Sequence, residues 1–144
     1  MIRIAVIDGQ GGGIGTTIIK KIKEVYGERT EVWALGTNAI ATAQMMKAGA
    51  NKGATGEHAI CHCAGRVDII TGPVSILLAN AMMGEVTPAI VEAIGSSGAP
   101  KLILPLTQES IAIVGAIREP LPHMVERLVT EYLAEYLQPV ESSR

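Results

Sequence analysis

The sequence has few aromatic residues, few cysteines and little net charge, and each shortage excludes a class of function. Aromatic residues make up 3% of the 144 residues, so the stacking platforms that bind single-stranded nucleic acid are not expected. A net charge of −2 argues against nucleic-acid binding through counterion release. The two cysteines, Cys61 and Cys63, lie too close together to cross-link distant elements. We expect both to be reduced thiols in a cytoplasmic protein.

Long apolar runs and a broad spread of basic residues are also missing. No run reaches the roughly 18 residues that span a bilayer, and a strand pattern begins at Ile2, so neither a membrane partner nor a signal peptide is expected. Lysine and arginine are absent from residues 67–100. Such a segment must be buried in the fold or in a subunit interface. We therefore expect a cytoplasmic homo-oligomer, most commonly a two-fold dimer.

Strand and helix patterns alternate along the chain. This order predicts a three-layer, Rossmann-like α/β domain over residues 1–139, with helices on both faces of a mostly parallel sheet and a frayed tail at 140–144. About five strands are expected, at residues 2–8, 30–35, 67–71, 102–106 and 111–116. The last two are too close for a parallel crossover of about a dozen residues. The fifth is therefore predicted to be antiparallel, at the edge of a sheet ordered 2-1-3-4-5.

Helical periodicity and end signals define the expected helices. The first carries Ile14, Ile18, Ile19, Ile22 and Tyr26 on one face and ends at Gly27. Residue 37 or 38 is expected to cap a second helix that runs to residue 47, a polar loop follows at 50–56, and a short helix covers 57–64. A further helix begins at the Thr-Pro pair of residues 87–88. The last is amphipathic, with seven apolar or tyrosine residues from 125 to 137 on one face, and stops at Pro139.

A glycine-rich segment, Gly-Gln-Gly-Gly-Gly-Ile-Gly, joins the first strand to the first helix. A helix N-terminus offers unpaired N–H groups and a partial positive charge, and glycine lets the backbone approach a phosphate closely. Strand, loop and helix follow in the order that this motif needs. The segment therefore predicts a phosphate site formed by Gly9, Gln10, Gly11, Gly12, Gly13, Ile14 and Gly15. The alternative is a glycine-rich turn that serves only tight packing of strand against helix.

Small polar residues follow the other expected parallel strands, and Thr55 lies in the polar loop at 50–56. Ligands of such sheets bind at the carboxyl ends of the strands, so these residues are expected to line the same pocket. The predicted rim consists of Thr37, Asn38, Thr55, Gly72, Ser75 and Thr107.

The spacing of Gly9, Gly13 and Gly15 resembles the Gly-x-x-x-Gly-Ile-Gly loop of short-chain dehydrogenases, which implies an NAD(P) cofactor. Two features of that family are missing. The region at 35–38 contains neither the acid nor the arginine that reads a ribose. No tyrosine is followed four residues later by lysine, so no catalytic residue is carried over. The cofactor stays open between NAD(P) and another nucleotide.

Longer strings resemble a family of short bacterial proteins that is classed only as a domain of unknown function. They include Ala-Leu-Gly-Thr-Asn, Lys-Ala-Gly-Ala-Asn-Lys-Gly-Ala-Thr-Gly-Glu and Ala-Asn-Ala-Met-Met-Gly-Glu-Val-Thr-Pro. The match covers nearly the whole chain. It implies a Rossmann-like fold and a cytoplasmic location, and brings no activity or catalytic residue.

A few reactive side chains lie outside the loop. His58, Cys61, His62 and Cys63 are soft-metal ligands, but their spacing matches no standard zinc pattern, and we expect no metal. Asp8 is unusual because a carboxylate repels phosphate, and it is suited to a metal ion, a loop N–H or a ligand hydroxyl.

Three functions are compatible with these features. The first is binding of a nucleotide or phosphorylated metabolite through residues 9–15, in a binding or regulatory role. The second is a small enzyme, either an NAD(P)-dependent oxidoreductase or one acting on a phosphorylated metabolite, with Asp8, Glu85 or Glu109 supplying acid–base chemistry. The third is a structural or interaction protein without a ligand.

Overall fold

A five-stranded parallel sheet forms the centre of the molecule. The computed structural model describes residues 1–137. The sheet has the order β3-β2-β1-β4-β5, and every neighbouring pair is parallel. Its strands are β1 (Ile2–Asp8), β2 (Thr30–Gly36), β3 (Lys52–Thr55), β4 (Ile69–Pro73) and β5 (Lys101–Leu104). The expected Rossmann-like α/β class is confirmed.

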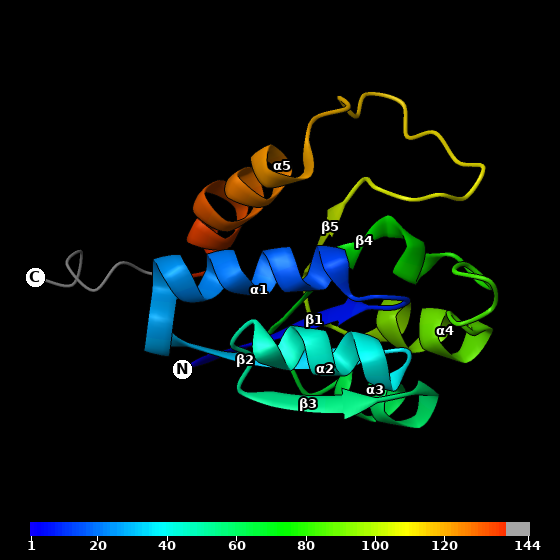
Figure 1. Ribbon diagram of the computed structural model, residues 1–144, viewed down its shortest axis with the longest axis horizontal. Coiled ribbons are helices and arrows are strands. Elements are labelled where there is room, and N and C mark those ends of the chain that lie inside the picture. The colour runs from blue at the N-terminus through cyan, green and yellow to red at the C-terminus, as the bar shows by residue number, and fades with distance from the viewer. Residues whose placement is uncertain (138–144) are drawn as a thin grey trace, which may run out of the picture.

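Helices cover both faces of this sheet (Figure 1). The helices are α1 (Gly13–Tyr26), α2 (Ala39–Lys47), α3 (Glu57–Cys63), α4 (Pro88–Ser96) and α5 (Leu121–Arg127), the last continuing as one π turn and one 3₁₀ turn to residue 135. Side chains of α1, α2 and α5 pack on one face, and side chains of α3 and α4 pack on the other. None of the helices within residues 1–137 is long and apolar enough to cross a membrane.

β1 is buried on both faces because its side chains alternate between the two helical layers. Ile4 and Val6 enter the core beneath α1 and α5. Ala5 and Ile7 enter the core beneath α3 and α4. A central parallel strand requires such a continuous apolar run, and this run brings Asp8 and the glycine loop to the carboxyl edge of the sheet.

The ends of several helices follow the expected signals. The Asn38 side chain accepts a hydrogen bond from the Ala41 amide at 2.8 Å and caps α2. Thr87 caps α4 in the same way, and Gly27 follows α1 with a positive φ. The side-chain oxygen of Asn38 is therefore bonded within the first turn of α2. Its side-chain amide donates to the Gln10 carbonyl of the glycine segment.

The edges of the sheet differ from the prediction. Residues 111–116 form no strand, so the expected antiparallel edge is wrong. They belong to the irregular segment 105–120, in which Val114 is fully exposed and Ile117 is 71% exposed. The sheet gains its remaining strand at the other edge, where β3 pairs with β2. The residues of β3 were expected to form a polar loop. This strand is short and open to solvent on the outer edge, so Lys52 and Gly53 gave no apolar alternation to reveal it.

The segment without lysine or arginine, residues 67–100, is explained mainly by the fold. Ile69, Ile70, Ile76 and Ile94 are completely buried in the domain itself. Met83 is the exception at 98% exposed. The shortage of charge in this segment therefore does not require a subunit interface.

The last helix is less regular than expected, although its apolar face is right. Val125, Val129 and Leu133 are buried against α1 and the sheet. Tyr132 and Tyr136 are exposed instead of buried. The Tyr26 hydroxyl donates to the Val129 carbonyl at 2.7 Å and ties α1 to this segment. The expected stop at Pro139 and the tail at 140–144 lie outside the described residues.

Candidate functional site

The glycine loop is held from beneath by Asp8, the last residue of β1. One carboxylate oxygen accepts the Gly9 amide at 2.8 Å, and the other accepts the Gly15 amide at 2.7 Å. The carboxylate therefore satisfies one of the open N–H groups in the first turn of α1. Of the roles expected for Asp8, the structure shows the bond to loop N–H groups.

The Asp8 side chain is only 3% exposed, and this burial shifts the pKa of its carboxyl. Removal from water raises the pKa of the carboxyl above its ordinary value, and the negative charge of Glu85 acts in the same direction. The amide hydrogen bonds from Gly15 and Gly9 work against this rise. A carboxylate thus lies buried at the start of a helix, where the helix dipole favours negative charge.

A second carboxylate, that of Glu85, holds the loop from the β2 side. Its Oε1 atom accepts three hydrogen bonds, from the Gln10 amide at 2.9 Å, the Thr37 hydroxyl at 2.6 Å and the Asn38 side-chain amide at 3.0 Å. Partial burial favours the neutral acid, but these donors outweigh burial and keep the pKa of Glu85 below its ordinary value. An ionised Glu85 therefore joins the loop to the end of β2.

Packing explains three of the five glycines in the loop. A methyl group on Gly9 would overlap the Thr37 hydroxyl, and one on Gly15 would overlap the sulfur of Met45. Gly12 has a φ of 73° and lies against the Ala41 carbonyl, where a methyl group would approach to 2.9 Å. Only glycine fits these positions without displacing a neighbour.

Gly11 and Gly13 are different, because the fold does not require glycine at either position. A methyl group on either would meet no atom of the described residues within 4 Å, and neither residue has a positive φ. Both are exposed. Within residues 1–137 their amides donate to no acceptor. Two N–H groups of the loop therefore have no acceptor among the described residues, and both glycines line the space in front of the loop.

That space is a pocket of about 380 Å³ at the carboxyl ends of β1, β4 and β5. A volume of this size lies at the small end of the range for ligand sites, roughly 300–1,000 Å³. The lining residues are Asp8, Gly9, Gln10, Gly11, Gly12, Gly13, Ile14, Pro73, Ser75, Met82, Leu106, Thr107, Gln108 and Glu109. The lining includes two carboxylates but no lysine, arginine or histidine.

The structure brings most of the predicted loop residues and two of the predicted rim residues to this pocket. Ser75 and Thr107 line it opposite the loop, and the Ser75 hydroxyl donates to the Thr107 hydroxyl at 2.7 Å. The Thr107 hydroxyl also accepts the Glu109 amide at 3.1 Å. This chain of bonds fixes the segment after β5 against the end of β4.

Five predicted site residues do not line the pocket. Thr37 and Asn38 bond to Glu85 instead. Thr55 lies beyond them at the outer strand and donates to the Thr42 hydroxyl. Gly72 is buried, where a methyl group would overlap the Ile7 carbonyl. Gly15 points its backbone amide at Asp8.

Sequence reasoning missed several residues of the pocket. Met82, Gln108 and Pro73 line it, and Glu85 closes one side of the loop. The sequence indicated a role for Glu85 and Glu109 only through their expected place near the carboxyl edge of the sheet, where both were candidates for acid–base chemistry. No periodicity marks residues 78–86, which form turns rather than a regular element.

The histidine and cysteine cluster lies elsewhere, on α3. The rings of His58 and His62 stack with centroids 6.3 Å apart. Burial raises the pKa of both thiols, Cys61 and Cys63, so they are poor thiolates. Among the described residues, no three His, Cys, Asp or Glu side chains are grouped closely enough to hold a metal ion.

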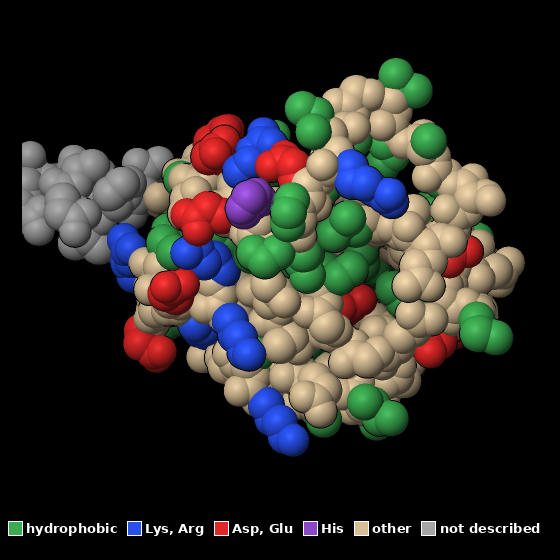
Figure 2. All heavy atoms as spheres, turned by 45° about the horizontal axis from the view of Figure 1, so that its top comes forward, with side chains coloured by type: hydrophobic (Ala, Val, Ile, Leu, Met, Phe, Trp, Pro, Cys, Tyr) green, Lys and Arg blue, Asp and Glu red, His purple; other side chains and the backbone are tan. Residues whose placement is uncertain are grey.

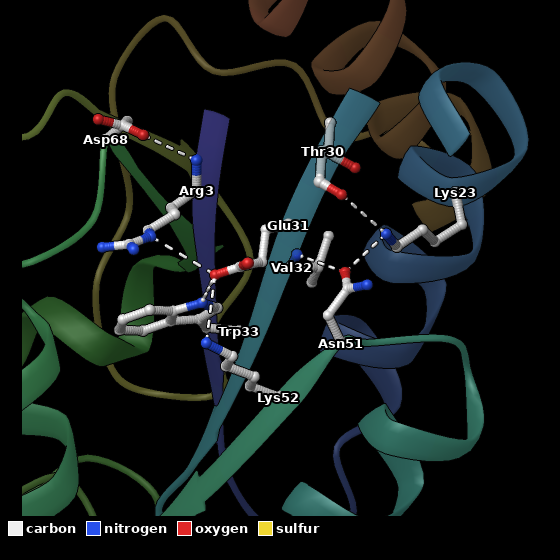
Figure 3. Close-up of polar contacts among 9 residues, drawn as sticks. All are labelled: Arg3, Lys23, Thr30, Glu31, Val32, Trp33, Asn51, Lys52 and Asp68. Atoms are coloured by element: carbon white, nitrogen blue, oxygen red, sulfur yellow. Dashed lines mark hydrogen bonds and ion pairs between the residues drawn. The ribbon is translucent and has the colours of Figure 1, made fainter. Parts of the chain in front are cut away.

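A second polar cluster lies at the opposite, amino-terminal end of the strands, and its contacts are structural (Figure 3). Glu31 accepts the Trp33 indole N–H at 2.6 Å and pairs with Arg3 at 3.4 Å. The indole bond, with Lys52 and Arg3 nearby, keeps the pKa of Glu31 below its ordinary value. Asn51 accepts from the Val32 amide and from Lys23. These bonds join the starts of β1, β2 and β3.

The parallel sheet, the glycine loop at its carboxyl edge and the pocket in front of that loop define a Rossmann-like α/β domain with a candidate ligand site. A comparison with protein families finds a match over nearly the whole chain. Residues 3–137 match the model of the domain of unknown function DUF3842, and the chain belongs to that family. A comparison with curated proteins finds no match.

Proposed function

We propose that this protein binds a small molecule through one phosphate group, held by the amides of Gly11 and Gly13. The observation that carries this proposal is that the same two glycines have open amides and no packing reason to be glycine. Both line the pocket. A side chain at either position would occupy the space that a phosphate needs, and the first turn of α1 supplies the favourable dipole.

The charge of the lining favours a ligand of low negative charge. Asp8 and Glu109 contribute carboxylates, and no cationic side chain faces them in the pocket. An anion would be held by backbone amides and by neutral polar side chains such as that of Thr107. Repulsion between like charges therefore disfavours a triphosphate more strongly than a single phosphate ester.

A binding or regulatory role fits the site better than acid–base catalysis. Both oxygens of Asp8 accept backbone amides, and Oε1 of Glu85 already accepts three donors. A general base must lie within reach of the proton that it removes, but Asp8 is only 3% exposed and Glu85 does not line the pocket. The carboxylates nearest the loop are instead committed to holding its shape.

Thermal unfolding with inorganic phosphate, ribose 5-phosphate, AMP and NAD as probes tests the proposal. A ligand at about 100 times its dissociation constant adds about 2.7 kcal/mol of stability, which is easily measured. Gly13→Val should abolish any shift, because Gly13 lines the pocket and a side chain there would stand in its open space. Gly95→Val is the matched control, since Gly95 is also an exposed helical glycine with open space around its α-carbon. No shift with any probe, or equal shifts in both variants, would refute phosphate binding.

We also propose that two copies of the chain associate through residues 105–120. Ile113, Val114 and Ile117 expose their side chains there. A groove of about 350 Å³ lies between β5, this segment and α5, and Figure 2 shows hydrophobic side chains gathered near the middle of that face. One molecule thus carries both protruding and recessed apolar surface, as a two-fold contact requires. Light scattering should give a dimer mass that Val114→Glu reduces to a monomer; a monomeric wild-type protein would refute it.

A further inference from the structure

We propose that Glu85 decides which phosphate compounds the loop accepts, by closing the side of the loop that lies over β2. The inference rests on the proposed phosphate site and adds the class of ligand. In a doubly wound sheet, a dinucleotide lies across the crevice beside the first strand, with one half on each side. Here the half over β2 is occupied by the protein's own side chains. The ligand body must then lie over β4 and β5.

The closure is formed by hydrogen bonds that a ribose would otherwise need. The donors at the end of β2 are the Thr37 hydroxyl and the Asn38 side-chain amide, and both donate to Oε1 of Glu85 at 2.6 and 3.0 Å. The same oxygen accepts the Gln10 amide of the loop at 2.9 Å. A ligand hydroxyl at the end of β2 would have to compete with Oε1 of Glu85 for these donors. Because that oxygen is charged, its hydrogen bonds are stronger than those of a neutral hydroxyl.

The space over the first residue of the loop is also filled. A methyl group built on Gly9 would overlap the Thr37 hydroxyl, and would lie 2.6 Å from the Met82 sulfur and 2.9 Å from Oε1 of Glu85. The side chains of Thr37, Met82 and Glu85 therefore pack directly over Gly9. Neither Thr37, Asn38 nor Glu85 lines the pocket in front of the loop.

The turn that carries Glu85 is held in a strained conformation. Asn80, Met82 and Met83 have φ values of 69°, 57° and 56°, a region that residues with side chains seldom adopt. Such strain persists only where surrounding contacts determine it, and it concentrates at functional sites. The contacts here include backbone hydrogen bonds within the turn, such as that from the Asn80 amide to the Val86 carbonyl at 2.6 Å. The side-chain bonds of Glu85 and the bond from the Met82 amide to Glu109 at 3.3 Å add to them.

The open side of the pocket indicates the shape of the ligand. Ser75, Thr107 and Gln108 offer hydroxyl and amide groups opposite the loop. With about 380 Å³ of space, this half suits a small hydroxylated body such as a sugar, attached to one phosphate. The class is therefore a sugar-phosphate-like monoester, and dinucleotides are excluded.

The wild-type protein supplies the first test, with ribose 5-phosphate and NAD as probes. Titration calorimetry should show ribose 5-phosphate binding at least about tenfold more tightly than NAD, a difference of about 1.4 kcal/mol. Adding ribose 5-phosphate should shift the amide NMR resonances of Gly11, Gly13 and Gln108. The resonances of Thr37 and Asn38 should stay unchanged. Tighter binding of NAD, or shifts at Thr37 and Asn38, would overturn the inference.

Substitution of Glu85 supplies the second test. Glu85→Ala should open the β2 side and raise the affinity for NAD about tenfold, whereas Glu85→Gln keeps the size of the side chain and should restore the exclusion. Glu92→Ala, on the exposed face of α4, is the control. Equal NAD affinity in Glu85→Ala and wild type, with ribose 5-phosphate still bound, refutes this inference and leaves the phosphate site standing. If neither ribose 5-phosphate nor inorganic phosphate binds, the proposed function itself fails. Should Glu85→Ala not fold, the wild-type titrations still decide.

Discussion

Two identical substitutions, two residues apart in the glycine loop, should have opposite effects on stability. Gly9→Ala places a methyl group against Thr37, Met82 and Glu85, whereas Gly11→Ala places one in open space. Neither residue has a positive φ, so backbone strain does not separate the two variants. The comparison therefore isolates the packing over Gly9 on which the closure by Glu85 depends.

The magnitude for Gly9→Ala follows from the bonds that must move. Displacing the Glu85 carboxylate weakens bonds to a charged acceptor, each worth about 1.5–3 kcal/mol, and forcing in an extra carbon costs about 1–3 kcal/mol. Alanine returns about 0.4–1 kcal/mol by restricting the unfolded chain. We expect Gly9→Ala to lose about 2–4 kcal/mol. Gly11→Ala makes no new contact, so only the gain remains.

Urea unfolding followed by circular dichroism measures this difference at fixed pH. With the gain in Gly11→Ala included, about 2.4–5 kcal/mol should separate the two variants, which corresponds to roughly 5–20 °C in Tm for a domain of this length. Equal stability of the two variants would show that the side chains over Gly9 move aside freely. The inference that Glu85 closes the β2 side of the loop would then be refuted.

Three further predictions concern contacts elsewhere in the fold. Tyr26→Phe should cost about 1–2 kcal/mol by urea unfolding, because it leaves the buried Val129 carbonyl without its donor; no loss would mean that water replaces the hydroxyl. Thr87→Ala should cost about 1 kcal/mol through the lost cap of α4, and unchanged stability would show that the cap contributes nothing. The pKa values of the two carboxyls that hold the loop should be shifted in opposite directions. Because the folded pKa of Glu85 is lowered, its contribution to stability is present above its unfolded pKa of about 4.3 and is lost as pH falls through the folded value. The raised pKa of Asp8 gives a contribution present below about 3.9 and lost as pH rises through its folded value. Carbon-13 NMR of the carboxyl groups checks both, and shifts in the same direction would contradict the assignment.

Strands and helices with strong local signals were predictable from the sequence. β1 is a continuous apolar run because it is buried on both faces, and α1 shows a clear period because one side packs on the sheet. β3 was missed because its position at the edge leaves it exposed. Residues 111–116 were mistaken for a strand because a short apolar run is typical of strands, although here they lie exposed in an irregular segment.

The site was predictable only where one short segment forms it. Residues 9–15 carry their own order of strand, loop and helix, so their place at the carboxyl edge followed from the sequence. The contacts of Glu85 did not follow, because they join residues 75, 48 and 47 positions apart. Thr37 and Asn38 were expected to bind a ligand, and nothing in their neighbourhood along the chain indicated that Glu85 would bond to them first.

The separation of these contacts along the chain also bears on the order in which the site assembles. The bond between Asp8 and the Gly15 amide spans seven residues, whereas the bond between Glu85 and the Gln10 amide spans 75. Short loops close with less entropy cost than long ones, so during synthesis from the N-terminus the glycine loop can form on β1 and α1 before Glu85 has been made. Pulsed hydrogen exchange during refolding should protect Gly15 before Gln10. A nascent chain would then carry a glycine loop whose β2 side is still open, and the proposed restriction to one kind of ligand would come only when the second half of the domain folds.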